Sequence, residues 1–316
     1  MNKKLSIVLI VLLSVLLASV ICGMVFLFHS DFKFDKFNFS VISFTSGTST
    51  KLVDSKEISD IKSLDIQSDT ADVSILTSDS NTIKVELYSD NLGEHEITEL
   101  DDSIRVVLME KDKVKWGFGK KINYIKIYVP MNYALTFNIN GTTGDVKIDD
   151  FSSANLNLSV TTGDVEIKEI NLATVNVITG DIEIGSVHTL KGEVKTGDLE
   201  IGTVRLIDII GTTGDIDIQE ADSVSINITT GDIDIHRVNE FLNITATTGD
   251  IDIDSINVTS NSKIKVNTGD IKIKNASDNI YVSGNAKIGD VNIKGGNRMS
   301  QIELNIEAKV GDIRVN

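Results

Sequence analysis

The chain has 316 residues, of which 41% are hydrophobic and only 5% aromatic, and its formal net charge is −16. That acidity excludes nonspecific binding to nucleic acid or to anionic lipid, since both need a cationic surface. The single cysteine, Cys22, lies within an apolar run, which excludes a disulfide framework, a cysteine-ligated metal site and a cysteine nucleophile.

The N-terminal segment, residues 1–30, is predicted to be a transmembrane anchor. Residues 5–28 carry no charged side chain, and about 20 apolar residues already span the hydrocarbon core as a helix. A cleaved secretory signal is the alternative, but its apolar region is only about 7–15 residues long and ends at a small-x-small site, which this stretch lacks. Lys3 and Lys4 precede the span, and the charges that follow it nearly cancel. The positive-inside rule therefore predicts a single-pass protein of the cell membrane with a cytoplasmic N-terminus and an extracellular C-terminal body.

Residues 31–60 are predicted to be a juxtamembrane segment and linker. The stretch DFKFDKFNFSVISF alternates phenylalanine with other residues, which is typical of an aromatic belt at the membrane surface. A first strand and a self-association segment are the alternatives. The following TSGTSTKLVDSKEISD is predicted to be a flexible polar spacer.

Residues 61–140 are predicted to form an irregular β region that caps a repeat region. This region contains the basic, aromatic stretch KVKWGFGKK. One interpretation is a hairpin tip whose aromatic side chains pack on the first repeat. The other is a contact site for an anionic envelope polymer, lipid headgroups or a partner protein, because aromatic residues and arginine are enriched at interfaces. The candidate contact residues are Trp116, Phe118, Lys120 and Lys121.

Residues 141–316 contain ten Gly-Asp pairs, each followed by an aliphatic residue, at spacings between 17 and 22 residues. A near-constant period of this kind predicts a repeat architecture. Glycine adopts a positive φ without steric cost and aspartate can bond nearby amides, so each pair is predicted to form a structural turn. The turn glycines are Gly144, Gly163, Gly180, Gly197, Gly214, Gly231, Gly249, Gly269, Gly289 and Gly311.

Aliphatic residues occupy fixed positions relative to each of these glycines. They stand two, four and, in many copies, seven places after it, as Ile233, Ile235 and Val238 do in one copy. Alternation of β-branched residues with a period of two predicts strands whose aliphatic side chains face inward. The residue directly before the glycine is threonine in most copies but Ile288 or Val310 in the last two, so this column is also expected to face inward.

These columns predict an all-β, single-stranded parallel β-solenoid of about ten rungs, each rung being one circuit of the chain with one Gly-Asp pair. Rungs stacked about 4.8 Å apart leave an unpaired strand edge at each uncapped end. The chain finishes with GDIRVN, so this last rung is expected to form the open end. Lys309 and Arg314 would protect that edge, unless a partner covers it.

Two acidic columns run along the predicted solenoid. One contains the aspartate of every Gly-Asp pair, and the other, three places after the glycine, holds six consecutive acids between basic residues. Calcium binding is one interpretation, because calcium takes carboxylate oxygens. In the other, the corner aspartates hydrogen-bond their own turns while the second column is solvated. The candidate calcium ligands are Asp215, Asp217, Asp232, Asp234, Asp250 and Asp252.

The sequence shows no recognisable catalytic motif. His29, His95, His188 and His236 are scattered and unpaired along the sequence, whereas zinc ligation needs histidines that cluster. Phosphate-binding loops, nucleophile elbows and zinc-protease motifs are missing. We therefore expect a protein that is not an enzyme and uses no cofactor. A polysaccharide-active enzyme on a β-helix scaffold is the alternative, and long loops would then interrupt the columns at mid-solenoid.

From about residue 58 onward the chain resembles the bacterial "putative adhesin" family of domains of unknown function, the DUF4097 type, which includes the LiaG-type cell-envelope proteins. The resemblance is carried by TADV at Ala71-Asp72, by the strand ending at Pro130 and by the serial TGDV and TGDI units. It implies a β-solenoid behind a membrane anchor in a Gram-positive-type envelope, and it supplies no catalytic residues.

The expected function is therefore non-enzymatic, in binding, adhesion or regulation linked to cell-envelope stress. The expected partners are the membrane, through the N-terminal helix, and an envelope polymer or another envelope protein, but no nucleic acid. A membrane-tethered sensor that acts through a neighbouring membrane protein is a further alternative.

Overall fold

The computed structural model describes residues 50–59, 61–89, 94–109, 123–131 and 133–316. The chain divides into two compact units, Met1–Gly47 and Thr48–Asn316, and every described residue lies in the second. Within the described ranges the structure is all β and contains no helix. Accordingly, those ranges hold no helix that could cross a membrane, and the predicted anchor lies outside them.

The first eight strands mix parallel and antiparallel pairing and cap the repeat region. They are β1 (Lys51–Ile58), β2 (Ser63–Ser68), β3 (Ala71–Ser78), β4 (Ile83–Ser89), β5 (Glu94–Leu100), β6 (Ser103–Met109), β7 (Asn123–Pro130) and β8 (Thr136–Thr143). β4 is antiparallel to β1 and β7, and β5 is antiparallel to β6. β3 and β8 pair in parallel with the first strand of the repeats. β1 lies within residues 31–60, so Lys51–Ile58 forms a strand where a flexible spacer was predicted.

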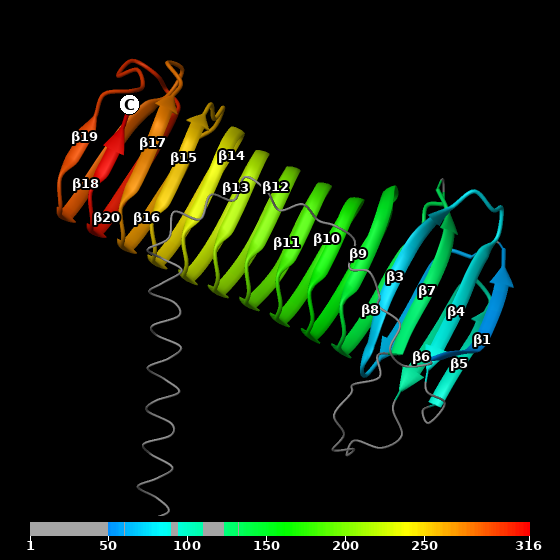
Figure 1. Cartoon of the computed structure of the whole chain (residues 1–316). Coiled ribbons are helices and arrows are strands. Elements are labelled where there is room, and N and C mark those ends of the chain that lie inside the picture. The colour runs from blue at the N-terminus through cyan, green and yellow to red at the C-terminus, as the bar shows by residue number, and fades with distance from the viewer. Residues whose placement is uncertain (1–49, 60, 90–93, 110–122, 132) are drawn as a thin grey trace, which may run out of the picture. The chain divides into compact units, whose positions relative to one another are not determined.

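The repeats form a parallel β-solenoid of about nine turns, whose strands lie side by side in Figure 1. Its long strands are β9 (Val146–Thr162), β10 (Val165–Thr179), β11 (Ile182–Thr196), β12 (Leu199–Thr213), β13 (Ile216–Thr230) and β14 (Ile233–Thr248). A Gly-Asp pair separates each long strand from the next. Equivalent residues of successive rungs are direct pairing partners, so the predicted columns are confirmed.

The later rungs are divided into shorter strands. They are β15 (Ile251–Ile256), β16 (Ser262–Thr268), β17 (Ile271–Ala276), β18 (Tyr281–Ile288), β19 (Val291–Ile293), β20 (Glu303–Val310) and β21 (Ile313–Val315). β15 and β16 together continue the two halves of β14, and β17 continues β15.

Aliphatic side chains fill the interior of each rung. Ile182, Ile184 and Val187, which stand two, four and seven places after Gly180, are all exposed by 3% or less. In this rung the strict alternation of inward and outward residues is interrupted at three places by runs of outward residues. The chain therefore bends three times per circuit and closes around a narrow aliphatic core.

The threonine before each corner glycine faces outward, which corrects the prediction that this column is buried. Thr179, Thr196 and Thr230 are exposed, and Ile288 and Val310 at the same position are 66% and 43% exposed. The corner begins two residues before the glycine. Both residues before the glycine therefore point to the solvent on the outer side of the corner. The alternation of inward and outward side chains does not continue through the corner.

The last two rungs stack in the reverse of their sequence order. β20 lies between β16 and β18, and β21 lies between β17 and β19. The rung of Gly289 therefore forms the end of the stack, and the rung of Gly311 lies inside it. The prediction that GDIRVN forms the open end, protected by Lys309 and Arg314, is wrong. At the actual end, Val291 at an inward position is 43% exposed.

Candidate functional site

The corner glycines have the role predicted for them. All ten have positive φ, between 136° and 152°. The stacked glycines also approach one another closely, because a Cβ added to Gly231 would lie 1.9 Å from the carbonyl oxygen of Gly214. The amide of each corner is satisfied between rungs, as Gly231 N–H donates to Thr248 O at 3.0 Å. The glycine column therefore has a structural role and contributes no functional side chain.

The corner aspartates form a ladder along the solenoid. The backbone N–H of Asp232 donates to Oδ1 of Asp215 at 2.8 Å, and the N–H of Asp250 donates to Oδ1 of Asp232 at 2.8 Å. The same bond recurs from Asp72 to Asp290, always between neighbouring rungs. In one of the two interpretations of the sequence, these side chains bond their own turns. Instead, every ladder aspartate except Asp290 at the end of the stack bonds a neighbouring rung, so the ladder ties the stack together.

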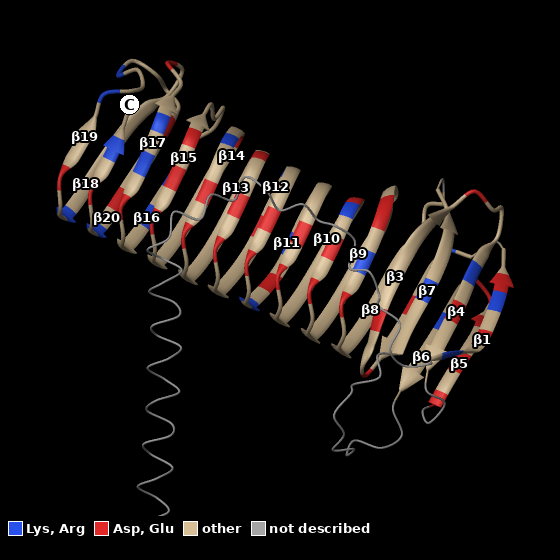
Figure 2. Ribbon diagram, viewed as in Figure 1, with Lys and Arg blue, Asp and Glu red and all other residues tan. Residues whose placement is uncertain are grey.

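The second acidic column forms a continuous file, the acidic file, of Glu166, Glu183, Glu200, Asp217, Asp234 and Asp252. It ends in ion pairs, because Lys147 Nζ lies 2.6 Å from Glu166 and Lys272 Nζ lies 3.5 Å from Asp252. Figure 2 shows the acidic residues recurring from strand to strand between these basic ends.

Within the acidic file, two carboxyl groups are harder to ionise than usual. Desolvation, followed by the charges of Glu183 and Asp217, raises the pKa of Glu200. Desolvation and then the charge of Asp252 raise the pKa of Asp234. Both shifts come first from the loss of solvent around these side chains and then from the neighbouring carboxylates, which stack about 4.8 Å apart.

The six candidate calcium ligands lie on the corner ladder and the acidic file. Asp215, Asp232 and Asp250 are on the ladder, where one oxygen of each already accepts a backbone hydrogen bond. Asp217, Asp234 and Asp252 are direct neighbours in the file. Over the described part of the chain, no group of three or more His, Cys, Asp and Glu side chains is arranged to hold a metal ion. Calcium binding stays a prediction.

The four predicted partner-contact residues, Trp116, Phe118, Lys120 and Lys121, lie outside the described residues. Two histidines that the sequence left unpaired have partners in the structure. His236 Nδ1 lies 2.8 Å from Asp254 Oδ2, and His188 Nε2 accepts a hydrogen bond from Arg205 Nη1 at 3.2 Å.

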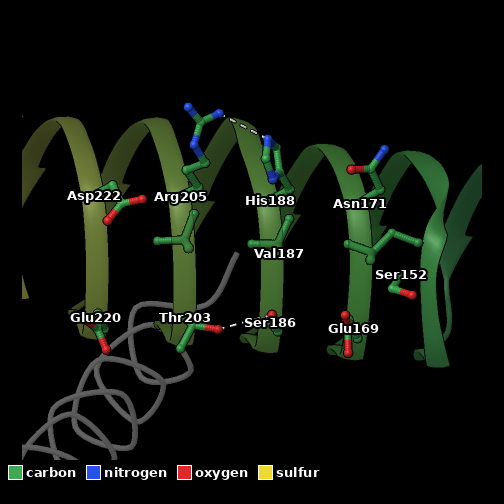
Figure 3. Close-up of a pocket in the computed structure, with 12 residues that line it drawn as sticks. Ser152, Glu169, Asn171, Ser186, Val187, His188, Thr203, Arg205, Glu220 and Asp222 are labelled. Carbon is green, nitrogen blue, oxygen red and sulfur yellow. Dashed lines mark hydrogen bonds between the residues drawn. The ribbon is translucent and has the colours of Figure 1, made fainter. Parts of the chain in front are cut away.

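A groove of about 400 Å³ crosses the outer surface of β9 to β13. Two rows of polar side chains line it, one six and one eight places after the corner glycine, and Figure 3 shows both rows. The buried aliphatic residues seven places after the glycine form its floor, including Val187 and Val204. The first row is Glu169, Ser186, Thr203 and Glu220, and the second is Asn171, His188, Arg205 and Asp222.

Sequence reasoning missed this groove because it lies in rungs that keep the aliphatic columns intact. The signal is a local change in outward residues. GSVH at 185–188 and GTVR at 202–205 replace KEIN at 168–171 and QEAD at 219–222 in the flanking rungs. Small residues therefore open the surface over two consecutive rungs. The glycines are required there, because a Cβ on Gly202 would lie 2.4 Å from the carbonyl oxygen of Gly185.

Comparison with known families finds one match. The model of the family described as Toastrack DUF4097 matches residues 61–253 and 237–316. No curated protein matches the chain significantly.

Several solved structures resemble the chain at low identity. A "putative adhesin" from Bacteroides fragilis is 17% identical, covers 85% of this chain and 98% of its own, and has a TM-score of 0.33. A "putative cell adhesion protein" from Clostridium sporogenes is 13% identical, with coverages of 84% and 99% and a TM-score of 0.20. A "putative lipid binding protein" from Parabacteroides distasonis is 15% identical, with coverages of 83% and 96% and a TM-score of 0.35. Likenesses of this size carry no information about what the present chain binds.

Proposed function

Because the chain belongs to the Toastrack DUF4097 family, we propose that it is a membrane-anchored, extracytoplasmic binding protein. In this proposal the N-terminus is cytoplasmic and residues 5–28 cross the cell membrane. The β-solenoid lies outside the cell, where it contacts an envelope polymer or another envelope protein. Its role is adhesion or regulation linked to envelope stress, and it catalyses no reaction.

One observation carries this proposal: the outer surface repeats in register from rung to rung, and a polar groove runs across several rungs. A surface of this kind distributes contacts along an extended ligand, as the surfaces of other repeat proteins do. An extended ligand can then bind through many weak contacts, each belonging to one rung.

The regularity of the middle rungs supports a non-enzymatic role. The strands from β9 to β14 are connected by two-residue Gly-Asp corners without inserted loops. Glu169 and Glu220, at opposite ends of one groove row, lie three rungs apart, or about 14 Å. The paired carboxylates of glycosidases are about 5–9.5 Å apart, so this pair does not fit that chemistry.

Membrane anchoring is supported by the sequence. Residues 5–28 are uncharged and follow Lys3 and Lys4, and a stretch of that length and polarity inserts with its basic end in the cytoplasm. The acidic body, which contributes to the net charge of −16, is then kept from anionic lipid headgroups by repulsion.

The test uses the full chain. Protease added to intact cells should degrade the β-solenoid while a cytoplasmic marker survives. The purified chain in detergent should co-sediment with isolated cell-wall material. A solenoid that resists protease until the cells are lysed would contradict the orientation. A chain that stays in the supernatant with both wall material and solubilised envelope proteins would contradict the binding function.

A further inference from the structure

Building on the proposed function, we propose that the groove across β9 to β13 binds a linear, hydroxyl-rich polymer that carries an oxyanion. The oxyanion lies against Arg205 and His188, and the polymer's hydroxyl groups contact the polar side chains on either side. Two polymers share this chemistry, a glycan of uronic acids and a polyol phosphate chain.

The shape of the groove comes from a local exchange of large and small residues. In the first row, Ser186 and Thr203 stand between the longer Glu169 and Glu220. The hydroxyl of Thr203 donates to Ser186 Oγ at 3.1 Å. The shorter side chains therefore leave space over the two rungs that carry these hydroxyl residues.

Arg205 supplies the positive charge in the groove. Its Nη1 donates to His188 Nε2 at 3.2 Å, as Figure 3 shows. Among the described residues no carboxylate forms an ion pair with Arg205, whereas Arg237 pairs with Glu220 at 3.4 Å and Arg314 with Asp312 at 2.7 Å. A guanidinium presents a planar fork of N–H donors that matches carboxylate and phosphate oxygens.

The remaining donors and acceptors fit the hydroxyl groups of such a polymer. Glu169 and Asp222 supply acceptors, and Asn171 supplies both a donor and an acceptor. From Glu169 to Glu220 the groove crosses three rung spacings, about 14 Å, which suits an extended oligomer rather than a single small molecule.

The acidity of the chain favours selective over general anion binding. With a net charge of −16 on the chain and with Glu169, Glu220 and Asp222 in the groove, the surface repels an anion except where it lies directly against Arg205. An oxyanion is therefore expected to bind at Arg205 and to lose affinity as salt is added, since salt screens exposed charges.

The experiment measures binding of defined oligomers to the full chain in detergent by calorimetry. The probes are tetragalacturonate, a glycerol phosphate oligomer and, as the neutral control, cellotetraose. Arg205→Gln removes the charge and should weaken binding of the anionic oligomer by about tenfold or more. Ser186→Phe should block the groove without removing any charge. The matched control is Arg314→Gln, on a different outward column, which should leave binding unchanged.

Each outcome decides between the polymers or overturns the proposal. Binding of tetragalacturonate alone identifies a carboxylate, binding of the phosphate oligomer alone identifies a phosphodiester, and binding of both supports the shared chemistry. Equal binding of cellotetraose, no binding of any probe, or unchanged binding by Arg205→Gln overturns the groove assignment. Wild-type and Arg205→Gln chains that sediment equally with wall material would overturn the groove but leave the proposed function intact. A wild-type chain that binds the probes but no envelope component would support the groove assignment and contradict the proposed function.

Discussion

At each corner of the solenoid, glycine and aspartate make separate contributions. The glycine accepts a positive φ and leaves room for the carbonyl of the neighbouring corner. The aspartate accepts a hydrogen bond from the backbone N–H of the next rung. Inside the stack, a corner without the glycine would clash with the carbonyl of the neighbouring corner, and a corner without the aspartate leaves one backbone donor without its partner.

Substitution of a mid-stack corner glycine is expected to be severe. In Gly231→Ala the new Cβ would lie 1.9 Å from the Gly214 carbonyl oxygen, and the fold would hold the alanine at a φ of +144°. The loss in the free energy of unfolding should be at least about 3 kcal/mol. Gly141→Ala is the control, because its Cβ would meet only Val160 Cγ2 at 3.6 Å. Denaturant melts followed by circular dichroism measure both, and equal stability of the two variants would contradict the prediction.

The corner ladder can be tested by separating hydrogen bonding from charge. Asp232→Asn keeps an oxygen that accepts from Asp250 N–H, and it removes one charge from a column of like charges. It should be neutral or slightly stabilising. Asp232→Ala removes the acceptor and should cost roughly 1–2 kcal/mol. If both variants lose the same stability in denaturant melts, the hydrogen bond from Asp250 N–H to Asp232 Oδ1 at 2.8 Å makes no contribution of its own to stability.

The role of the corner glycines followed from the sequence because glycine at the same position of every repeat indicates a positive φ. The orientation of the preceding residue did not follow. Ile288 and Val310 replace threonine there, and apolar substitution indicated burial, yet both are exposed. The two replacements occur in the last two rungs, where the stack ends, and an exposed apolar residue is ordinary at a protein surface.

Among the strands, electrostatics depends on which residues the register makes neighbours. The acidic file places six carboxylates on successive strands, and desolvation together with these neighbouring charges raises the pKa of Glu200 and Asp234. A few positions away, Asp254 has a different environment. Hydrogen bonds from Lys274 and His236 lower the pKa of Asp254. The two aspartates should therefore affect stability in opposite directions.

The pH dependence of stability distinguishes these two aspartates. The raised pKa of Asp234 means that the folded chain holds its proton more tightly, so its contribution is favourable at low pH and is lost as the pH rises through the folded pKa. Asp234→Asn should raise the melting temperature at pH 7, and the gain should shrink in acid.

Asp254 provides the contrasting measurement. Its lowered pKa gives stability above the unfolded pKa, and that stability is lost as the pH falls through the folded pKa. Asp254→Asn should lower the melting temperature at pH 7, and the difference from the wild type should fade in acid. Parallel pH profiles for the two substitutions would contradict this assignment.

The reversed order of the last two rungs can be tested by cross-linking. Lys272 and Arg314 are direct partners, and Asn292 lies one rung further on. In a Cys22→Ser background, the pair Lys272→Cys and Arg314→Cys, about 4.8 Å apart, should form a disulfide. The pair Lys272→Cys and Asn292→Cys, about 9.6 Å apart, should not. Mass spectrometry of non-reduced peptides reads the result, and the reverse pattern would restore sequence order.

This reversal could not be read from the sequence. The edges of successive rungs carry the same aliphatic pattern, so any rung can pair with any other, and adjacency in sequence is then the simplest assumption. Residues 294–302 connect β19 to β20, which lies between β16 and β18. A linker of this length permits either order, and it contains no periodic signal.

For the whole molecule, charge is the dominant long-range property. A net charge of −16 and two acidic columns mean that folding brings like charges together. The solenoid tolerates this repulsion because its core and backbone pairing are continuous from the cap to the end rung. Conditions that weaken repulsion should therefore stabilise the folded chain.

The dependence of the melting temperature on ionic strength tests this expectation. The melting temperature should rise between low salt and about 0.15 M NaCl, where the screening length falls to about 8 Å. Calcium and magnesium should be compared at equal ionic strength. Equal effects of the two ions would dispose of a calcium site, whereas an additional rise with calcium would support the candidate aspartates.

The inserted final rung also constrains how the protein is made. During synthesis the N-terminal cap emerges first, and each new circuit can wind onto the one before it as far as β17. The segment β18–β19 emerges next, but it cannot yet form its final strand pairing, because its partners β20 and β21 have not yet been translated. The insertion of β20–β21 between the rung of β16–β17 and the rung of β18–β19 is therefore expected to follow the translation of all six strands.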